Sequence, residues 1–304
     1  MRQSCIRRTF GGLILGIIKT ENLSYVYSPG TPFEKTALSD INIEINKGEF
    51  VGIIGHTGSG KSTLVQHFNG LVKPTSGKIF VDGEDIWDNP KEIKKLRFKV
   101  GLVFQYPEYQ LFDETVRSDI AFGPKNMGLS EDEIKSSVDY AAKLVGLDDE
   151  LLSKSPFDLS GGQKRRAALA GVLAMKPQVL ILDEPTAGLD PVGRDNILTR
   201  IKEYQKSSGS TVLLVSHSME DVAKVADRVL VMDHSNVAMF DTVDNVFSQS
   251  EKLQKIGLNV PHITQVCMGL KRSGVDISDG IYTVDKAVEA ILSLYKNKGG
   301  TAKC

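Results

Sequence analysis

The 304-residue chain contains little cysteine and almost no excess of charge of either sign. Its three cysteines, Cys5, Cys267 and Cys304, are far apart in the sequence, so they show neither metal-site spacing nor the framework of a disulfide-rich secreted domain. This usage is typical of a reducing, cytoplasmic environment. The net charge of −1 argues against a protein that binds nucleic acid through a basic surface.

Long apolar runs are also scarce, and none approaches the ~20 residues of a membrane-spanning helix. The nearest is Gly11 to Ile18, which follows two arginines. A secretory signal would need a small-residue cleavage site after this run, and none follows. The run leads instead into Lys19 to Tyr27, which alternates like a β-strand. We therefore expect residues 1–18 to be an N-terminal extension, for whose residues 1–15 the sequence suggests no function.

What the chain does have is a glycine-rich loop of the phosphate-binding form GxxxxGK[ST] at residues 55–63. An apolar run, Phe50 to Ile54, precedes it and predicts a buried strand, while Ser62 to Phe68 predicts a helix. Glycines let successive N–H groups face a phosphate, and the helix N-terminus adds positive potential. We expect Lys61 to contact the β- and γ-phosphates and Ser62 to bind Mg²⁺. The predicted ATP-binding residues of this loop are Gly55, His56, Thr57, Gly58, Ser59, Gly60, Lys61, Ser62 and Thr63.

Two further apolar strands end in residues suited to nucleotide chemistry. The strand Val179 to Leu182 is followed by Asp183 and Glu184. This pair could merely cap the next element, but beside a phosphate-binding loop we interpret Asp183 as a Mg²⁺ ligand. A strand at residues 211–215 is followed by His217, and a lone histidine is more often structural than catalytic. Spacing alone therefore leaves its role open.

Between these motifs lies Leu159-Ser160-Gly161-Gly162-Gln163. Ser160 and Gln163 form a capping box, so this segment could simply begin a helix. However, each glycine in the first turn costs about 1 kcal/mol relative to alanine. The three cations that follow also oppose the helix dipole. Both features are expected if the helix start, or its cations, face phosphate or acidic partners.

Three motifs in this order resemble the ATP-binding cassette (ABC) family. They are the phosphate-binding loop, the Leu159–Gln163 segment and the segment Leu180-Ile181-Leu182-Asp183-Glu184-Pro185. The resemblance implies an α/β P-loop NTPase fold with a mainly parallel core sheet, an antiparallel β subdomain and a helical subdomain. It implies ATP hydrolysis with Glu184 as the general base. His217 would contact the γ-phosphate and steady Glu184, and Gln105 would sense Mg²⁺ and the attacking water. Tyr27 would stack on adenine, with Tyr25 as the alternative, although either could be an ordinary strand residue.

The resemblance also implies a second ATPase subunit, identical or homologous. In ABC proteins the signature helix closes over the ATP of the partner in a head-to-tail dimer. Ser160 and Gly162 would contact that γ-phosphate, and Asp190 belongs to the matching D-loop. The predicted signature residues are Ser160, Gly161, Gly162 and Gln163, and the predicted Mg²⁺ ligands are Ser62, Gln105 and Asp183.

Four segments resemble one branch of the family, the ATPase subunits of energy-coupling factor (ECF) transporters, which import vitamins, cobalt and nickel. They are Tyr106 to Phe112, Asp119 to Pro124, Gly162 to Arg166 and Ala170 to Met175. In addition, Ser28 to Leu38 looks like the second of the branch's two paralogous ATPases. The resemblance implies a peripheral protein on the cytoplasmic face of the membrane, with a membrane scaffold and a substrate-binding membrane protein as partners. The ATPase of another ABC transporter is an alternative. A soluble ABC protein of ribosomes or DNA is another, but such proteins usually have two cassettes or long coiled insertions.

We predict an ABC ATPase domain at residues 19–245, a C-terminal helical region at 246–296 and a frayed tail at 297–304. A helical subdomain at about 106–158 would include a capping box at Ser130 to Glu133 and an apolar helical stripe that ends at Gly146. The apolar cluster Tyr106 to Phe112, in which a proline discourages helix, is expected to form a groove for a short helix of the scaffold. Ordinary packing is the alternative. The region ends in a predicted helix, Val284 to Tyr295, which by resemblance adds contacts between the ATPase subunits.

Overall fold

The computed structural model describes residues 16–297, so Cys5, Cys304, the predicted extension up to residue 15 and the predicted tail from residue 298 lie outside the described residues. Its centre is a six-stranded sheet in the order β11-β10-β4-β9-β8-β7. Within this sheet the neighbouring strands from β10 to β7 all pair in parallel. Strand β11 lies at the edge and pairs antiparallel to β10. This confirms the mainly parallel core. The strands are β4 (Phe50–Gly55), β7 (Val100–Val103), β8 (Val179–Asp183), β9 (Thr211–Val215), β10 (Arg228–Asp233) and β11 (Asn236–Thr242).

A second sheet contains β1 (Gly16–Tyr27), β2 (Lys35–Ile41), β3 (Glu44–Asn46), β5 (Ser76–Val81) and β6 (Glu84–Asp85). All of its pairings are antiparallel, and its order is β2-β1-β5-β6 with β3 also paired to β1. This confirms the antiparallel sheet. The first strand begins at Gly16 rather than Lys19, because Ile17 and Ile18 are buried in the core between the two sheets.

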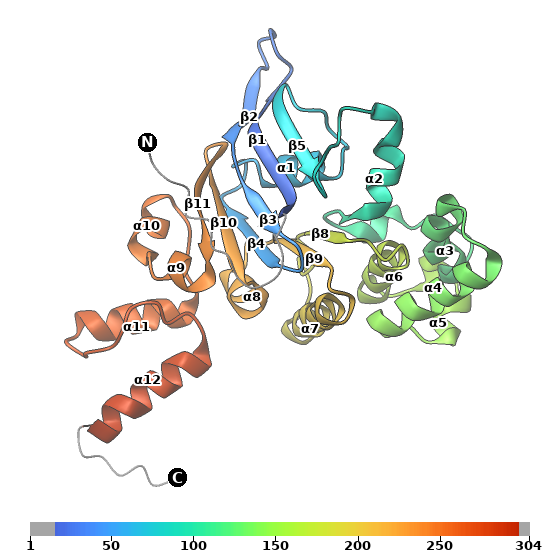
Figure 1. Cartoon of the computed structure of the whole chain (residues 1–304). Coiled ribbons are helices and arrows are strands. Elements are labelled where there is room, and N and C mark those ends of the chain that lie inside the picture. Colours follow the sequence, from blue (N-terminus) through green and yellow to red (C-terminus); the bar gives the residue numbers. More distant parts are fainter. Residues whose placement is uncertain (1–15, 298–304) are drawn as a thin grey trace, which may run out of the picture.

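The middle of the chain is helical and lies beside the β7 and β8 edge of the central sheet (Figure 1). Helices α3 and α4 both pack against α6, and their apolar residues form one cluster with β8 and β9. The Ser130 to Glu133 capping box and the left-handed Gly146 bound α4 as predicted. The elements are α1 (Lys61–Phe68), η1 (Pro90–Glu92), α2 (Ile93–Lys99), η2 (Pro107–Gln110), α3 (Val116–Met127), α4 (Glu131–Val145), α5 (Asp149–Ser153), η3 (Pro156–Asp158) and α6 (Gly161–Leu173).

One local prediction needs correction. Pro107 was expected to discourage helix in Tyr106 to Phe112, but it begins the short 3₁₀ helix η2. The physical reason is that proline suits the first turn of a helix, where its missing N–H would have no partner anyway. Tyr106 before it adopts a left-handed conformation with φ of 55°.

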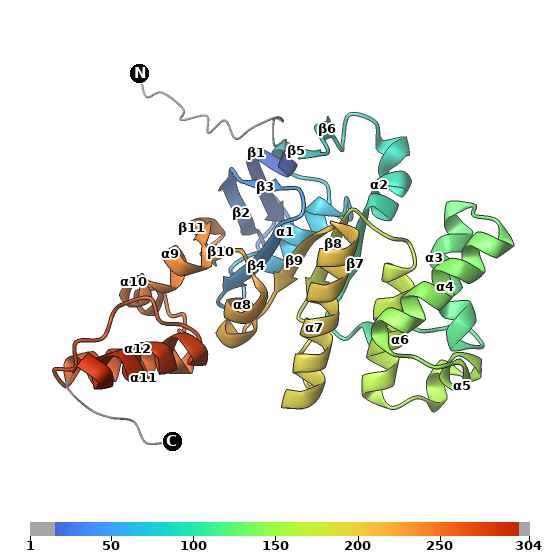
Figure 2. The same cartoon turned by 60° about the horizontal axis from the view of Figure 1, so that its bottom comes forward.

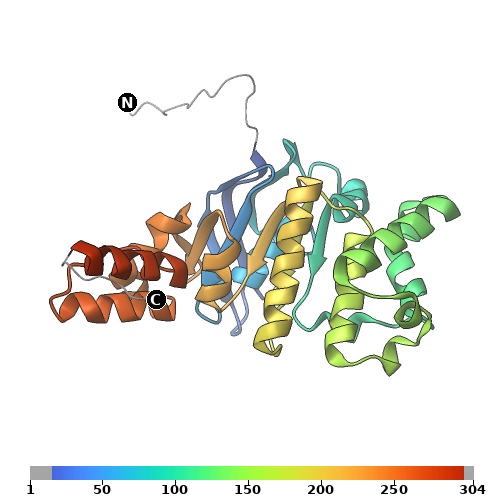
Figure 3. The same cartoon turned by 90° about the horizontal axis from the view of Figure 1, so that it is seen from below.

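The remaining helices are α7 (Pro191–Ser208), α8 (Met219–Val225), α9 (Val243–Phe247), α10 (Ser250–Lys255), α11 (His262–Arg272) and α12 (Val284–Asn297). The long helix α7 runs beside the central sheet (Figure 2). Helices α11 and α12 lie side by side at the end of the molecule opposite α3–α6 (Figure 3). Among residues 16–297, no helix has the length and apolar character needed to span a membrane.

Candidate active site

The phosphate-binding loop lies at the carboxyl edge of the central sheet, between β4 and α1. Because β4, β8 and β9 are parallel and adjacent, the residues that follow them come together at this edge. The Glu184 N–H donates to the carbonyl of Val215 at 3.0 Å and so fixes the ends of β8 and β9 to each other. The sheet thus brings the predicted loop, carboxylate pair and histidine to one place.

The loop has its expected conformation. Gly60 precedes α1 with φ of 105°, and a Cβ there would collide with the Ala37 carbonyl oxygen, so only glycine fits. The Lys61 ammonium is buried and donates to the carbonyls of Gly55 (2.8 Å) and His56 (3.0 Å). Burial lowers the pKa of Lys61, while the nearby charges of Glu184 and Asp183 act against that shift. A phosphate would supply the negative charge that this buried cation requires.

Asp183 is 6% exposed and lies beside the Ser62 hydroxyl. Burial raises the pKa of Asp183, although the Ser62 hydrogen bond and the charges of Lys61 and His217 lower it. A hydroxyl and a carboxylate are oxygen ligands of the kind that Mg²⁺ prefers. Ser62 and Asp183, two of the three predicted ligands, therefore fit a magnesium ion. Gln105 follows β7 by two residues and is exposed at the same sheet edge.

Glu184 and His217 are in direct contact, with 2.6 Å between Glu184 Oε1 and His217 Nε2. Burial raises the pKa of Glu184, and the charge of Asp183 raises it further. Burial lowers the pKa of His217, and Lys61 adds to that effect. A neutral imidazole protonated on Nε2 can therefore donate to a basic carboxylate. Glu184 has a left-handed φ of 56°, a conformation that costs free energy in a non-glycine residue and that the surrounding contacts must hold in place.

The two candidate adenine residues lie in different environments. Tyr27 is 39% exposed, and its hydroxyl is 3.1 Å from the Thr63 hydroxyl. It lines a pocket that continues along Phe33, Lys35 and the phosphate-binding loop. Tyr25 packs instead against the core and against the His67 ring. The geometry favours Tyr27 over Tyr25 as a platform for a base.

The signature segment begins α6 with both capping-box bonds in place: the Gln163 side chain accepts from the Ser160 N–H at 2.8 Å, and the Ser160 side chain accepts from the Gln163 N–H. Ser160 and Gly161 are exposed. A Cβ added at Gly161 or Gly162 would meet nothing within 4 Å. Packing inside this chain therefore gives no reason for either glycine.

Arg165, also on α6, is a site residue whose role the sequence did not specify. It is 5% exposed and forms a two-pronged ion pair with Glu108 of η2, through Nη2 (2.8 Å) and Nε (3.2 Å). It also donates to the carbonyl of Ala187, three residues after Glu184. The expected acidic partner of a cation near the signature thus exists within the chain. Arg165 joins the signature helix to η2 and to the loop that follows Glu184.

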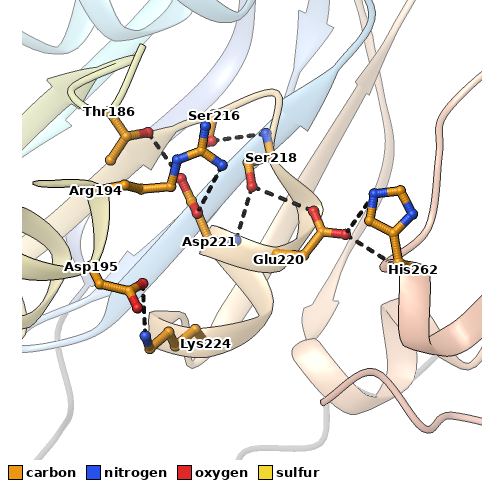
Figure 4. A network of polar contacts seen from close by, with 9 residues as sticks. All are labelled: Thr186, Arg194, Asp195, Ser216, Ser218, Glu220, Asp221, Lys224 and His262. Carbon is orange, nitrogen blue, oxygen red and sulfur yellow. Dashed lines mark hydrogen bonds and ion pairs between the residues drawn. The ribbon is translucent and has the colours of Figure 1, made fainter. Parts of the chain in front are cut away.

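A second missed residue is Asp221 of α8, which is 4% exposed (Figure 4). It accepts a hydrogen bond from the Thr186 hydroxyl at 2.9 Å and lies 3.9 Å from the Arg194 guanidinium of α7. Thr186 follows Glu184 by two residues, and α8 begins two residues after His217. Asp221 therefore ties together the loops that carry Glu184 and His217. The sequence could not have indicated this pair, because Thr186 and Asp221 lie 35 residues apart and meet only in the folded chain.

Comparison with known proteins agrees with this geometry. The family described as "ABC transporter" matches residues 38–187. The energy-coupling factor transporter ATP-binding proteins EcfA2 of Clostridium acetobutylicum and Clostridium perfringens are 58% and 57% identical to the chain. The matches cover 92% of this chain and 98% and 99% of those proteins.

Solved structures give the same answer. CbiO1 of Clostridium perfringens, described as part of the ABC transporter complex CbiONQ, is 44% identical with a TM-score of 0.71, covering 85% of this chain and 97% of that one. The ATP-binding cassette MJ0796, a dimer with ADP and phosphate, is 29% identical with a TM-score of 0.68, covering 74% and 98%. The chain belongs to the ABC transporter family and, within it, to the ATP-binding proteins of energy-coupling factor transporters.

Proposed function

We propose that the chain hydrolyses Mg²⁺-bound ATP as one half of a head-to-tail pair of cassettes, and that this powers uptake of a vitamin or a transition-metal ion through a membrane scaffold. The observation that carries the hydrolytic part is the contact between Glu184 and His217 beside Lys61 and Asp183. A basic carboxylate held by a neutral histidine, next to a buried lysine, is suited to activating water against a phosphate.

In this proposal Glu184 orients the attacking water and accepts its proton. Its raised pKa favours that role, because a more basic carboxylate takes the proton more readily. His217 holds Glu184 through its Nε2–H and would contact the γ-phosphate. Lys61, which donates to the carbonyls of Gly55 and His56, would donate to phosphate oxygens when ATP is bound. Ser62, Asp183 and Gln105 would hold Mg²⁺, which, when bound, neutralises charge on the phosphates.

The second half of the proposal concerns the partner cassette. The exposed Ser160 and the two glycines without packing neighbours support an ATP-mediated contact with another chain. Asp190 of the D-loop caps α7 by accepting from the Gly193 N–H at 2.6 Å, so its side chain shapes the loop near that contact. The dimeric cassette MJ0796 supports this arrangement by similarity.

We further propose the predicted division into an ATPase domain at 19–245 and a C-terminal helical region at 246–296. In that region α12 has an exposed apolar stripe. It suits the expected role of adding contacts to the second cassette, which would cover the stripe. Its members are Val284, Val288, Ile291, Leu292 and Tyr295.

The membrane scaffold is proposed to insert a short helix into an apolar groove between α2, α3 and α6. The rings of Phe112 and Phe122 meet edge to face across 5.1 Å there and are 59% and 49% exposed. The predicted cluster is only partly a docking surface, since Leu111 is 8% exposed and packs in the core. Tyr109 is 85% exposed and directly precedes Gln110, which lines the groove. The groove's lining includes Arg97, Phe98, Leu111, Phe112, Phe122 and Met175.

The test is purification of the full-length chain from its native membranes, with its partners identified by mass spectrometry and then reconstituted in vesicles. A second cassette, a shared scaffold and interchangeable substrate-binding proteins, with uptake that requires ATP, are expected. A dedicated permease pair would instead indicate another kind of ABC transporter. Recovery on ribosomes or DNA would exclude the transport function.

A further inference from the structure

Three side chains outside the proposed hydrolytic machinery gather where the phosphate-binding loop meets the β10–β11 turn. His56 Nε2 lies 3.1 Å from Asp233 Oδ1, and His234 Nδ1 lies 2.7 Å from the same oxygen. The two imidazole rings are 4.9 Å apart. One ligand atom from each of the three residues lies within 4.8 Å of the others.

The hydrogen-bonding requirements of His56 indicate that this cluster lacks a cation. Its Nδ1 is 3.0 Å from the carbonyl oxygen of Thr57, which can only accept, so Nδ1 must carry a proton. In a neutral imidazole Nε2 is then an acceptor as well, and it faces the Asp233 carboxylate, another acceptor. A cation between them resolves this conflict. It is either a second proton on His56 or a metal ion.

The positions of the three residues are fixed by backbone contacts rather than by the side chains alone. Asp233 ends β10, which pairs with β4, the strand that leads into the loop of His56. His234 and Ser235 form the turn with left-handed φ of 41° and 68°. The Ser235 N–H donates to the Ser59 carbonyl at 3.2 Å, which binds the turn to the phosphate-binding loop. Positive φ at both positions is the usual geometry of a two-residue hairpin turn, so the turn fixes His234 beside the end of β10.

The donor set defines the class of ion. Two imidazole nitrogens and one carboxylate oxygen suit Zn²⁺ and similar ions such as Co²⁺ and Ni²⁺, whereas Mg²⁺ prefers oxygen ligands. The Nδ1–H of His56 that donates to a backbone carbonyl matches the usual way in which a metal-binding imidazole is oriented. Three protein ligands leave one position for water.

We propose that His56, Asp233 and His234 bind one divalent transition-metal ion of the Zn²⁺ class, at a site distinct from the Mg²⁺ ligands Ser62 and Asp183. The ion joins the phosphate-binding loop to the β10–β11 turn. Because His56 belongs to the loop that contacts phosphate, occupancy of this site is expected to change the affinity of the chain for ATP.

The test uses the full-length chain, stripped of metal by a chelator and free of nucleotide and Mg²⁺. Zn²⁺ affinity is measured by competition with a chromophoric chelator. His234→Ala is the main variant, because the side chain is 82% exposed and its removal does not threaten the fold. Asp233→Asn is the second. We expect each to weaken one Zn²⁺ site at least tenfold. His262→Ala is the matched control, since that exposed histidine also faces a carboxylate, Glu220, and should leave Zn²⁺ binding unchanged.

Co²⁺ gives an independent readout, because its visible absorption reports imidazole ligands and low coordination number. We expect the parent and His262→Ala to give the same spectrum and His234→Ala to lose it. The proposal is wrong if His234→Ala and Asp233→Asn bind Zn²⁺ like the parent. It is also wrong if binding disappears only in Asp183→Asn, which would place the ion among the hydrolytic residues. No Zn²⁺ bound at micromolar concentration would mean that a second proton on His56 resolves the conflict instead.

Discussion

The beginnings of α1 and α6 make an instructive comparison, because both are glycine-bearing helix N-termini assigned to ATP. At α1, Gly60 is required by the chain's own backbone, and Lys61 is buried beside Glu184 and Asp183. At α6, Ser160 and Gly161 are exposed, and neither glycine of the signature has a neighbour that a Cβ would touch.

Under the proposed function, this difference indicates where each ATP contact would be completed. Gly60 is constrained by the chain's own backbone at Ala37, so the phosphate-binding loop is shaped without a partner. The two signature glycines cost helix stability and have no neighbour within the chain, which fits the proposed contact with a second cassette. Under the proposed function, one chain presents a phosphate site that it builds by itself and a second contact that a partner cassette would complete.

The largest effect is expected from Glu184→Gln, which tests the hydrolytic role of the residues beside the start of α1. The amide keeps the shape but cannot accept a proton, so we expect turnover to fall by about 10²–10⁴-fold with ATP binding retained. Each tenfold loss corresponds to about 1.4 kcal/mol of transition-state stabilisation. Steady-state phosphate release is measured beside nucleotide binding. Lys61→Ala should instead weaken ATP binding itself, and near-normal turnover in Glu184→Gln would remove the assigned base.

Ser160→Arg tests the proposed contact between the start of α6 and a second cassette. A bulky cation at the exposed start of α6 should block ATP-driven pairing of cassettes, while the same chain's phosphate-binding loop still binds ATP. Size-exclusion chromatography in the Glu184→Gln background measures pairing. Ser136→Arg is the control, because it places the same charge on an exposed position of α4. Pairing that equals that of the parent would contradict the role of the signature.

Part of the fold and of the candidate site could be predicted from the sequence alone. The strands at 50–54, 179–182 and 211–215 were predictable because buried parallel strands are short continuous apolar runs between polar loops. The contact between Glu184 and His217 was not, since it depends on β8 and β9 being neighbours, and only the resemblance connected them. Asp221 and Glu108 were missed because their roles arise from tertiary contacts with Thr186 and Arg165.

The groove between α2, α3 and α6 differs from both helix starts, because its proposed contact is with the membrane scaffold and does not involve ATP. The double change Tyr109→Glu and Phe112→Glu alters exposed rings, so we expect ATPase activity of the isolated cassette pair within about twofold of the parent and loss of co-purification with the scaffold. Val266→Glu, an exposed apolar position on α11, is the control.

Leu111→Glu should behave differently from this pair. It places a charge in the core, which costs several kcal/mol, so the chain itself should be destabilised. An intact complex and normal uptake in the double variant would exclude the groove as the docking site. Loss of ATPase activity in the isolated pair would favour ordinary packing of the cluster.

A smaller effect is expected at Asp221, which acts through Thr186 rather than on ATP. Asp221→Ala removes the acceptor of the Thr186 hydroxyl and leaves Arg194 without its carboxylate. We expect a fall of about tenfold in kcat with KM nearly unchanged, together with a loss of about 1–3 kcal/mol in the free energy of unfolding. Asp221→Asn keeps an acceptor and should recover most of kcat. Equal loss in both variants would mean that charge, rather than positioning of the loop, is what matters.

The smallest effect is expected from a change of pH, which alters the protonation of Glu184 beside the phosphate-binding loop. Burial and the charge of Asp183 raise the pKa of Glu184, and a base works only when it is deprotonated. As the pH falls, Glu184 is therefore protonated earlier than an ordinary glutamate with a pKa of about 4.3, and kcat should fall at a correspondingly higher pH. The lowered pKa of His217 keeps the imidazole neutral above that range, so it adds no further loss near neutrality. The measurement is kcat against pH at saturating ATP, with ATP binding to Glu184→Gln followed at each pH to separate binding from chemistry. If kcat stays level down to the pH at which a solvent-exposed glutamate titrates, the environment of Glu184 does not make it a stronger base.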